Sequence, residues 1–236
     1  MVLPDSGALV LEQLSGKPLA VILKREANRF LGPLRRGRMA ALGRLTGYWL
    51  NQLHEATRTE PLRHDSALFL ADIEDRFGRC RGVRQEAIDR LMRRISRASH
   101  QIHGHPIPAA ARQGDFIPQN ILVDENLVRV VDFESFSRSE SIYDDVATFV
   151  TYIRALSAFP YYSQPALRAL ADSFLQAYGV TGDERPFRLY LARALVVLIS
   201  EMNLQRAALY APKRLRLLQA QLERVCAELP RTASAA

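Results

Sequence analysis

Three polar residues in the middle of the chain have the types and the spacing of a site that transfers a phosphoryl group. Asp115 is followed five residues later by Asn120, and Asp132 comes twelve residues after that. A phosphoryl transition state spreads negative charge over oxygen atoms, so it needs Mg²⁺ on hard oxygen ligands and a carboxylate that orients the attacking hydroxyl. Two aspartates and an asparagine can provide both. The alternative is that Asp115 and Asn120 only form a turn around Pro118.

The residues between Asn120 and Asp132 predict a β-hairpin. Residues 121–123 and 128–131 are short runs rich in β-branched side chains, and residues 124–126, Asp-Glu-Asn, have the composition of a turn. A hairpin sets its two flanking loops side by side at one end. We therefore expect Asn120 and Asp132 to reach the same cation, with Asp115 close by. For the turn itself we expect no further role.

This motif resembles that of the aminoglycoside and choline kinase type of phosphotransferases, distant relatives of the protein kinases. Residues 112–120, RQGDFIPQN, and 132–134, DFE, are similar to the family's HGDxxxxN and DFE segments. The resemblance implies that Asp115 is the catalytic base and that Asn120 and Asp132 hold the metal and its nucleotide. It implies that Glu134 is a carboxylate that either supports a metal ligand or binds a second metal. Gln113 stands where the family has histidine, but its amide can still donate and accept the hydrogen bonds that orient the loop.

The N-terminal segment resembles the hinge between the two lobes of such kinases. Residues 8–19, ALVLEQLSGKPL, are similar to the hinge strand and its exit into the large lobe. The resemblance implies that the backbone at Glu12 and Leu14 contacts the adenine of ATP. The alternative is an ordinary strand that ends in a Ser-Gly turn.

A hinge at this position implies a large lobe with most of the small, nucleotide-covering lobe missing. No Gly-rich loop precedes the hinge, and the whole chain has three lysines, Lys17, Lys24 and Lys213. Residues 20–24, AVILK, superficially resemble the strand that carries the phosphate-binding lysine, so Lys24 in such a strand is a second interpretation. Otherwise we expect the small lobe to come from an upstream coding segment, a partner chain or a divergent minimal N-terminus.

Two further segments extend the resemblance. Residues 143–147, YDDVA, are similar to the family's YDLA segment, which opens a helix; Asp145 is in register and Asp144 is one residue out. An aspartate there can cap the helix or brace the catalytic loop. Residues 49–54, WLNQLH, are similar to the end of the long helix after the hinge, which implies that His54 packs and hydrogen-bonds rather than binding a metal.

The chain as a whole predicts a mostly helical α+β fold, and the resemblance implies a protein-kinase-like C-terminal lobe with a catalytic β-hairpin. We expect a hinge-like strand and its exit over residues 1–19, a helical lobe over 20–229 with its catalytic loop at 112–134, and a disordered tail over 230–236. Apolar residues recur at helical spacing in seven stretches. These stretches are residues 34–57, 66–77, 84–103, 143–156, 164–178, 183–203 and 212–229.

The composition agrees with one globular domain. The chain has 236 residues, of which 48% are hydrophobic and 24% are charged. No apolar run approaches the roughly 18 residues that span a bilayer, and the first residues lack the pattern of a secretory signal. Cys80 and Cys226 lie far apart and match no redox or metal motif. We expect a cytoplasmic protein without a membrane partner.

The net charge of +7 comes almost wholly from arginine. Arginine-rich stretches at residues 35–38 and 90–97 could attract an anionic partner, although most such charge lies on a solvated helix face. Without interleaved aromatic residues or a nucleic-acid-binding motif, the sequence argues against a nucleic-acid partner. His100, His103 and His105 could bind a transition metal, but the end of a helix is a sufficient explanation for such a cluster.

Two functions remain open from the sequence. The first is an ATP- and Mg²⁺-dependent phosphotransferase that acts on a hydroxyl of a small molecule. The second is a catalytically inactive kinase-like module that binds or scaffolds a partner. Retention of Asp115, Asn120 and Asp132 favours the first function, whereas the lack of a nucleotide cover favours the second. No motif in residues 58–100 or 183–229, where the family selects its acceptor, indicates a particular substrate.

Overall fold

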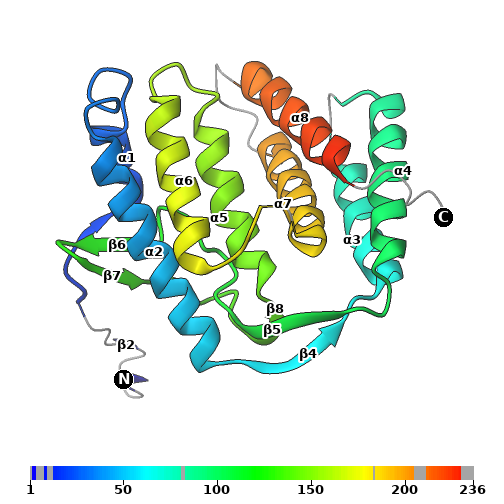
Figure 1. Ribbon diagram of the computed structural model, residues 1–236, viewed down its shortest axis with the longest axis horizontal. Coiled ribbons are helices and arrows are strands. Elements are labelled where there is room, and N and C mark those ends of the chain that lie inside the picture. The colour runs from blue at the N-terminus through cyan, green and yellow to red at the C-terminus, as the bar shows by residue number, and fades with distance from the viewer. Residues whose placement is uncertain are drawn as a thin grey trace.

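The computed structural model is a body of helices with small antiparallel sheets along one side (Figure 1). It describes residues 2–3, 8–9, 13–80, 83–182, 184–204 and 211–229. The helices are α1 (Leu19–Glu26), α2 (Arg36–Ala56), α3 (Ser66–Arg79), α4 (Gln85–Gln101), α5 (Tyr143–Leu156), α6 (Gln164–Tyr178), α7 (Arg185–Leu204) and α8 (Ala211–Glu228). The strands are β1 (Val2–Leu3), β2 (Ala8–Leu9), β3 (Lys17–Pro18), β4 (Thr59–Arg63), β5 (Pro106–Arg112), β6 (Ile121–Asp124), β7 (Leu127–Val130) and β8 (Ser137–Ser141).

All seven helices predicted from the apolar spacing are present, and each end lies within two residues of the predicted one. Capping residues explain where some of these helices begin and end. The carboxylate of Asp65 accepts hydrogen bonds from the backbone amides of Ala67 and Leu68 and so caps α3. Gly179 ends α6 in a left-handed conformation with φ of 92°. No helix in the described part of the chain is both long and apolar enough to cross a membrane.

The segment that contains Lys24 is a helix, so the interpretation of residues 20–24 as a lysine-bearing strand is wrong. Leu19, Ile22 and Leu23 are buried and recur at helical spacing, which places them on one face of α1. The amide of Ala20 donates a hydrogen bond of 2.9 Å to the carbonyl of Pro118. This bond fixes the beginning of α1 against the loop that contains Asp115.

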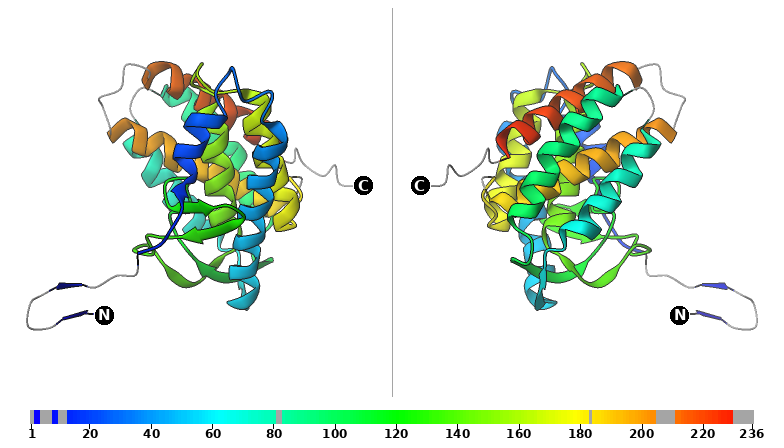
Figure 2. Two further views of the ribbon diagram at one scale, coloured as in Figure 1. Left: turned by 90° about the vertical axis from the view of Figure 1, so that its left-hand side faces the viewer. Right: turned by 90° about the vertical axis from the view of Figure 1, so that its right-hand side faces the viewer.

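The predicted hairpin is present as β6 and β7. Its antiparallel register runs from Ile121 opposite Val130 to Asp124 opposite Leu127, and β3 pairs with the other edge of β6. A second three-stranded sheet has the order β4-β5-β8 and lies at one end of the helices (Figures 1 and 2). The loop from β5 to β6 therefore connects the two sheets, and the loop from β7 to β8 returns beside it.

Helices α2 and α6 pack side by side at unusually short range (Figures 1 and 2). A Cβ atom on Gly43 would lie 2.2 Å from the carbonyl oxygen of Leu170, and one on Gly47 would lie 2.4 Å from that of Phe174. Any side chain at either position would push the helices apart. The two glycines, four residues apart on one helix face, therefore set the distance between α2 and α6.

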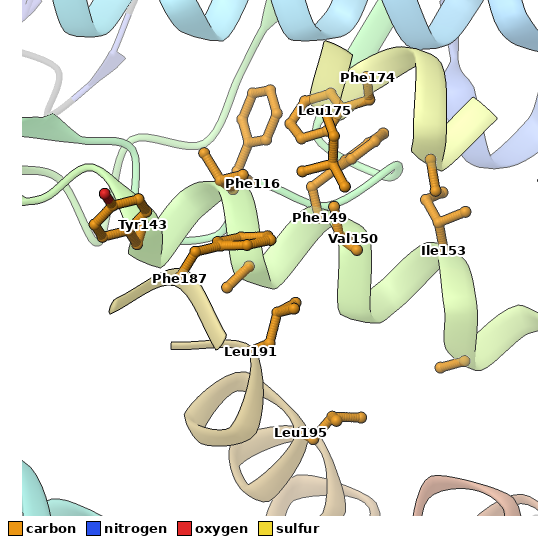
Figure 3. Close-up of a cluster of buried hydrophobic side chains, with 14 of the residues drawn as sticks. Phe116, Tyr143, Phe149, Val150, Ile153, Phe174, Leu175, Phe187, Leu191 and Leu195 are labelled. Atoms are coloured by element: carbon orange, nitrogen blue, oxygen red, sulfur yellow. The ribbon is translucent and has the colours of Figure 1, made fainter. Parts of the chain in front are cut away.

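The loop with Asp115 is attached to the core through the next residue, Phe116, which is fully buried. Its ring centroid lies 5.7 Å from that of Phe149 on α5 and 6.4 Å from that of Phe174 on α6 (Figure 3). Trp49 of α2 also stacks on Phe116, with the ring centroids 5.9 Å apart. Because aromatic packing of this kind fixes position as well as burying apolar area, the core determines where Asp115 stands.

Candidate active site

Asp115 and Asn120 are bonded to each other across the loop between β5 and β6. The side-chain amide nitrogen of Asn120 donates to the carboxylate Oδ2 of Asp115 at 2.8 Å and to its backbone carbonyl at 3.0 Å. Both partners are acceptors, so the nitrogen must face Asp115, and the amide oxygen points elsewhere. Within the described residues this oxygen accepts no hydrogen bond. This oxygen is therefore available as a hard ligand for a cation beside the Asp115 carboxylate.

Asp132 is brought to the same place by the hairpin. The backbone amide of Val131 donates to the carbonyl of Asn120 at 2.9 Å, so Asp132 follows directly after a residue bonded to Asn120. Asp132 is exposed and has φ of +62°, a left-handed conformation that is uncommon for a residue other than glycine. Such backbone persists only where its surroundings hold it, and it concentrates at functional sites.

Gln113 supplies much of that support. Its side chain is fully buried, and its amide nitrogen donates to the carbonyl of Asp132 at 2.6 Å and to that of Val131 at 3.1 Å. Its amide oxygen accepts from the backbone amide of Asp115 at 2.8 Å. One side chain therefore binds the backbone at both aspartates.

Asp145 braces the same loop from α5. Its Oδ2 accepts from the backbone amide of Gln113 at 2.7 Å, and its Oδ1 accepts from that of Gly114 at 3.0 Å. Nε2 of His54 lies 3.7 Å from Oδ2, and Nδ1 of His54 is 2.6 Å from the hydroxyl of Tyr178. The side chains of Asp145, His54 and Tyr178 are buried, and both oxygens of Asp145 bind amides of the loop rather than amides of α5. Of the two roles open from the sequence, Asp145 therefore has the brace and not the cap.

The neighbouring Asp144 has a separate role. It pairs with Arg193 of α7, which also binds Asp72 of α3 at 2.7 Å. This network connects α3, α5 and α7.

Gly114 allows the two loops to approach each other. Its φ is +96°, and a Cβ atom there would lie 2.3 Å from the carbonyl oxygen of Ser135. No other residue fits this position without moving one of the loops. The glycine thus keeps the backbone after Asp132 close to Asp115.

The charges of this site act on the pKa of Asp115. Burial raises the pKa of its carboxyl most strongly, and the charges of Asp132 and Asp145 raise it further, while the hydrogen bond from Asn120 opposes them. Glu201 of α7 also senses this site: burial is the main cause that raises its pKa, Arg76 opposes the rise, and the charge of Asp115 adds to it. Glu201 therefore lies within electrostatic reach of Asp115. No sequence motif marks it, so sequence reasoning did not find it.

Two of the residues predicted for the site are not brought into this cluster, and a third lies outside the described residues. Glu134 is exposed and forms no hydrogen bond or ion pair with the described residues. No three His, Cys, Asp or Glu side chains in the described ranges are arranged to hold a metal ion, so Glu134 does not complete a set with Asp115 and Asp132. Leu14 is half-buried in the segment before β3, and Glu12 lies outside the described residues.

The hairpin turn has a contact that its composition did not predict. The hydroxyl of Ser15 donates to Oδ2 of Asp124 at 2.6 Å, and Arg129 lies 3.4 Å from the same oxygen. Arg129 also donates to the carbonyl of Ser15 at 3.2 Å. The expectation that residues 124–126 form only a turn is therefore wrong for Asp124, which fastens the predicted hinge exit to the hairpin.

Solved structures share this arrangement of helices and sheets, although no family model matches the chain and no curated protein is similar to it in sequence. A glucosamine kinase in complex with glucosamine, ADP and inorganic phosphate superposes with a TM-score of 0.65 at 17% identity, over 88% of this chain and 60% of that one. The chain has a kinase-like fold. This confirms the predicted fold class, a mostly helical α+β lobe of the kinase type.

Two further structures agree with it. A second glucosamine kinase structure gives a TM-score of 0.63 at 18% identity, over 89% of this chain and 59% of that one. A candidate aminoglycoside phosphotransferase from Ralstonia eutropha gives 0.57 at 15% identity, over 92% of this chain and 71% of that one. The chain thus spans about 60% of the length of the glucosamine kinases. At these identities the likeness concerns the fold alone.

Proposed function

We propose that this chain is the large lobe of an ATP- and Mg²⁺-dependent phosphotransferase that acts on a hydroxyl of a small molecule. The observation that carries the proposal is the bond of 2.8 Å between Asn120 and the Asp115 carboxylate, with Asp132 held beside it in a left-handed conformation. A turn-forming role for these residues would not require the strained backbone at Asp132. The kinase-like fold supports the same reaction class.

Asp115 would orient the acceptor hydroxyl and take its proton. The raised pKa of its carboxyl makes it a stronger proton acceptor than an ordinary exposed aspartate. Asn120 holds that carboxylate in place through its amide nitrogen. Phe116 fixes the loop in the core, so the carboxylate does not have to be ordered when substrate binds.

Asn120 and Asp132 would hold Mg²⁺, through an amide oxygen and a carboxylate. Proteins usually bind Mg²⁺ at phosphoryl-transfer sites through one or two side chains, with phosphate oxygens and waters completing the shell. The two donors here fit that use, and a full protein cage is not needed. When bound, the cation would neutralise charge on the transferring phosphate. Glu134 is exposed without a partner among the described residues and would remain available to a second cation.

The nucleotide would lie between this loop and the segment that leads into β3, with the backbone at Glu12 and Leu14 against adenine. The bond from Ser15 to Asp124 supports this placement, because it fastens that segment to the hairpin that carries Asn120 and Asp132. A small lobe from an upstream segment or a partner chain would cover the phosphates. For the acceptor, glucosamine is the first candidate, since a glucosamine kinase shares the fold.

A catalytically inactive binding module is the second candidate, and the position of the lysines favours it. Lys17 lies on β3, opposite Val123, and Lys24 lies on α1. Of these two lysines, one therefore lies on a helix and the other on a strand that pairs with the hairpin itself, and neither matches the lysine-bearing strand of a nucleotide-covering lobe. A module of this kind would keep the fold and bind no MgATP.

Calorimetric titration with MgATP and a coupled assay of ADP release, with glucosamine as acceptor, test the proposal. Asp115→Asn should lower kcat by about 10² to 10⁴ and leave the MgATP Kd within about twofold, because the change removes a base and keeps the shape. Asp132→Ala should abolish Mg²⁺-dependent binding of ATP. Asp89→Asn, on the exposed side of α4, is the matched control and should change neither value.

Three outcomes decide between the candidates. Unchanged kcat in Asp115→Asn would remove Asp115 from the mechanism. Equal MgATP affinity in Asp132→Ala and the unmutated protein would remove the metal site. Absence of any MgATP binding by the unmutated protein would favour the inactive module.

A further inference from the structure

A cavity of about 550 Å³ lies between α5, α6, α7 and α8, away from the candidate active site. Thr151 and Arg154 line it from the last turns of α5. Asp145, which braces the loop with Asp115, lies nine residues before Arg154 on the same helix, or about 14 Å at the rise of an α-helix. The cavity is therefore a second site, with the volume of a pocket for a small ligand.

The charged groups around this cavity come from three helices and do not balance. They are Arg154 of α5, Arg168 and Asp172 of α6, and Arg224 and Glu228 of α8. Nε of Arg224 lies 3.5 Å from the carboxylate of Glu228, so these two charges are paired. Two guanidinium groups then face the single carboxylate of Asp172.

Those two guanidinium groups have no partner in the described part of the chain. Neither Arg154 nor Arg168 donates a side-chain hydrogen bond or lies within 4.0 Å of a described carboxylate. The side chain of Arg154 reaches solvent, yet burial is the largest effect on its pKa and lowers it. The charge of Arg224 lowers this pKa further, whereas the charges of Asp172 and Glu228 raise it. Gathering positive charge in a partly desolvated space destabilises the fold unless an anion compensates it.

The cavity also has an apolar wall, beside the polar side chains of Ser157, Gln164 and Gln221 and one buried hydroxyl. Leu167 of α6 and Leu191 and Leu195 of α7 line it, and Figure 3 shows the two α7 leucines beneath α5. Thr151 is 3% exposed, and its hydroxyl has no hydrogen-bond partner among the described residues. A buried hydroxyl without a partner costs free energy, so this end of α5 is not optimised for the empty cavity.

We propose that this cavity binds a small organic oxyanion, a carboxylate or a phosphate monoester with an apolar group. The anionic head lies between Arg154 and Arg168, and the apolar group rests on the leucines. The fork of N–H donors on a guanidinium matches the oxygen geometry of both heads. A cation is disfavoured because it would meet two guanidinium groups for one carboxylate. This site is independent of the phosphotransfer proposed above.

Isothermal titration in EDTA, with phenyl phosphate and phenylacetate as probes, tests the proposal. EDTA removes Mg²⁺ and so suppresses metal-dependent binding of phosphate at the candidate active site. We expect saturable binding of at least one probe, at least tenfold weaker in Arg154→Gln. Asp172→Asn should bind more tightly, because it removes the opposing charge. Arg58→Gln, an exposed arginine paired with Glu55, is the matched control and should bind as the unmutated protein does.

Further probes separate the contribution of the charge from that of the apolar group, and distinguish a carboxylate ligand from a phosphate ligand. Inorganic phosphate should bind more weakly than phenyl phosphate, and benzyl alcohol should not bind, if both the charge and the apolar group matter. If phenylacetate binds more tightly, the anionic group of the ligand is a carboxylate. If phenyl phosphate binds more tightly, it is a phosphate. MgATP binding should be the same in Arg154→Gln and the unmutated protein.

Four results would overturn the proposal. They are no saturable binding of either probe at millimolar concentration, equal binding in Arg154→Gln, an equal loss in Arg58→Gln, or weaker binding in Asp172→Asn. Should Arg154→Gln fail to fold, Arg168→Gln replaces it, because Arg168 lies on an exposed part of α6 and should tolerate the change.

Discussion

Replacing Asp145 by asparagine isolates the brace that holds the catalytic loop. The change keeps the shape of the side chain and removes its charge and one of its two oxygen acceptors. In the protein both oxygens are used: Oδ2 binds the amide of Gln113 at 2.7 Å, and Oδ1 binds that of Gly114 at 3.0 Å. Whichever way an asparagine turns, its NH₂ group faces one of these N–H donors.

The expected cost follows from that mismatch. A hydrogen bond to a charged acceptor contributes about 1.5 to 3 kcal/mol, and a buried donor left unpaired costs about 1 to 3 kcal/mol. Asp145 is 1% exposed, so water cannot replace the lost partner. Relief from burying a charge offsets part of the loss. We expect Asp145→Asn to lower the free energy of unfolding by about 2 to 4 kcal/mol.

Urea unfolding at pH 7 measures this difference, with Asp75→Asn as the matched control. Asp75 forms an exposed ion pair with Arg79 on α3, and exposed pairs contribute about 0 to 1 kcal/mol. Amide hydrogen exchange at Gln113 and Gly114 should become faster in Asp145→Asn alone. If the two variants unfold within about 0.5 kcal/mol of each other, the brace contributes no more than a surface pair, and the reasoning fails.

Two further predictions concern stability. Gly114→Ala should cost more than about 2 kcal/mol by urea unfolding, because φ is +96° and the new Cβ would lie 2.3 Å from a carbonyl oxygen; Gly37→Ala has nothing within 4 Å and should cost nothing. Burial lowers the pKa of His64 from its ordinary 6.5, and His103 and His105 lower it further, against Asp65. As pH falls, the unfolded chain therefore binds a proton at this histidine before the folded protein does, and stability decreases below about pH 6.5. Measured by thermal unfolding, the loss of stability from pH 7 to pH 5 should be smaller in His64→Gln than in the exposed His100→Gln. Equal losses in the two variants would contradict this prediction.

The parts of the fold that the sequence predicted are those in which side-chain pattern and backbone agree. In α6, buried Leu167, Leu170 and Phe174 recur at helical spacing before the left-handed Gly179. In the hairpin, the buried Ile121 and Val130 are directly opposite each other. Such patterns report which face is buried, and burial determines the element.

The parts that were missed have no such pattern. All five residues of β4 are exposed, and β8 is made of small and charged residues, so only backbone pairing with β5 defines them. The contact between Ser15 and Asp124 joins residues 109 positions apart. No local propensity encodes a pairing of that kind, which follows only from the tertiary fold.

Gln113 shows why a departure from a motif need not mean a lost support. A neutral histidine has one ring N–H and one acceptor nitrogen, whereas the glutamine amide has two N–H groups and an oxygen. Gln113 uses them to bind the carbonyls of Val131 and Asp132 and the amide of Asp115 at the same time. The left-handed backbone at Asp132 and the orientation of Asp115 thus share one buried anchor. Read from the sequence, this residue lowers the match to the family, whereas in the structure it binds together the two loops on which the proposed chemistry depends.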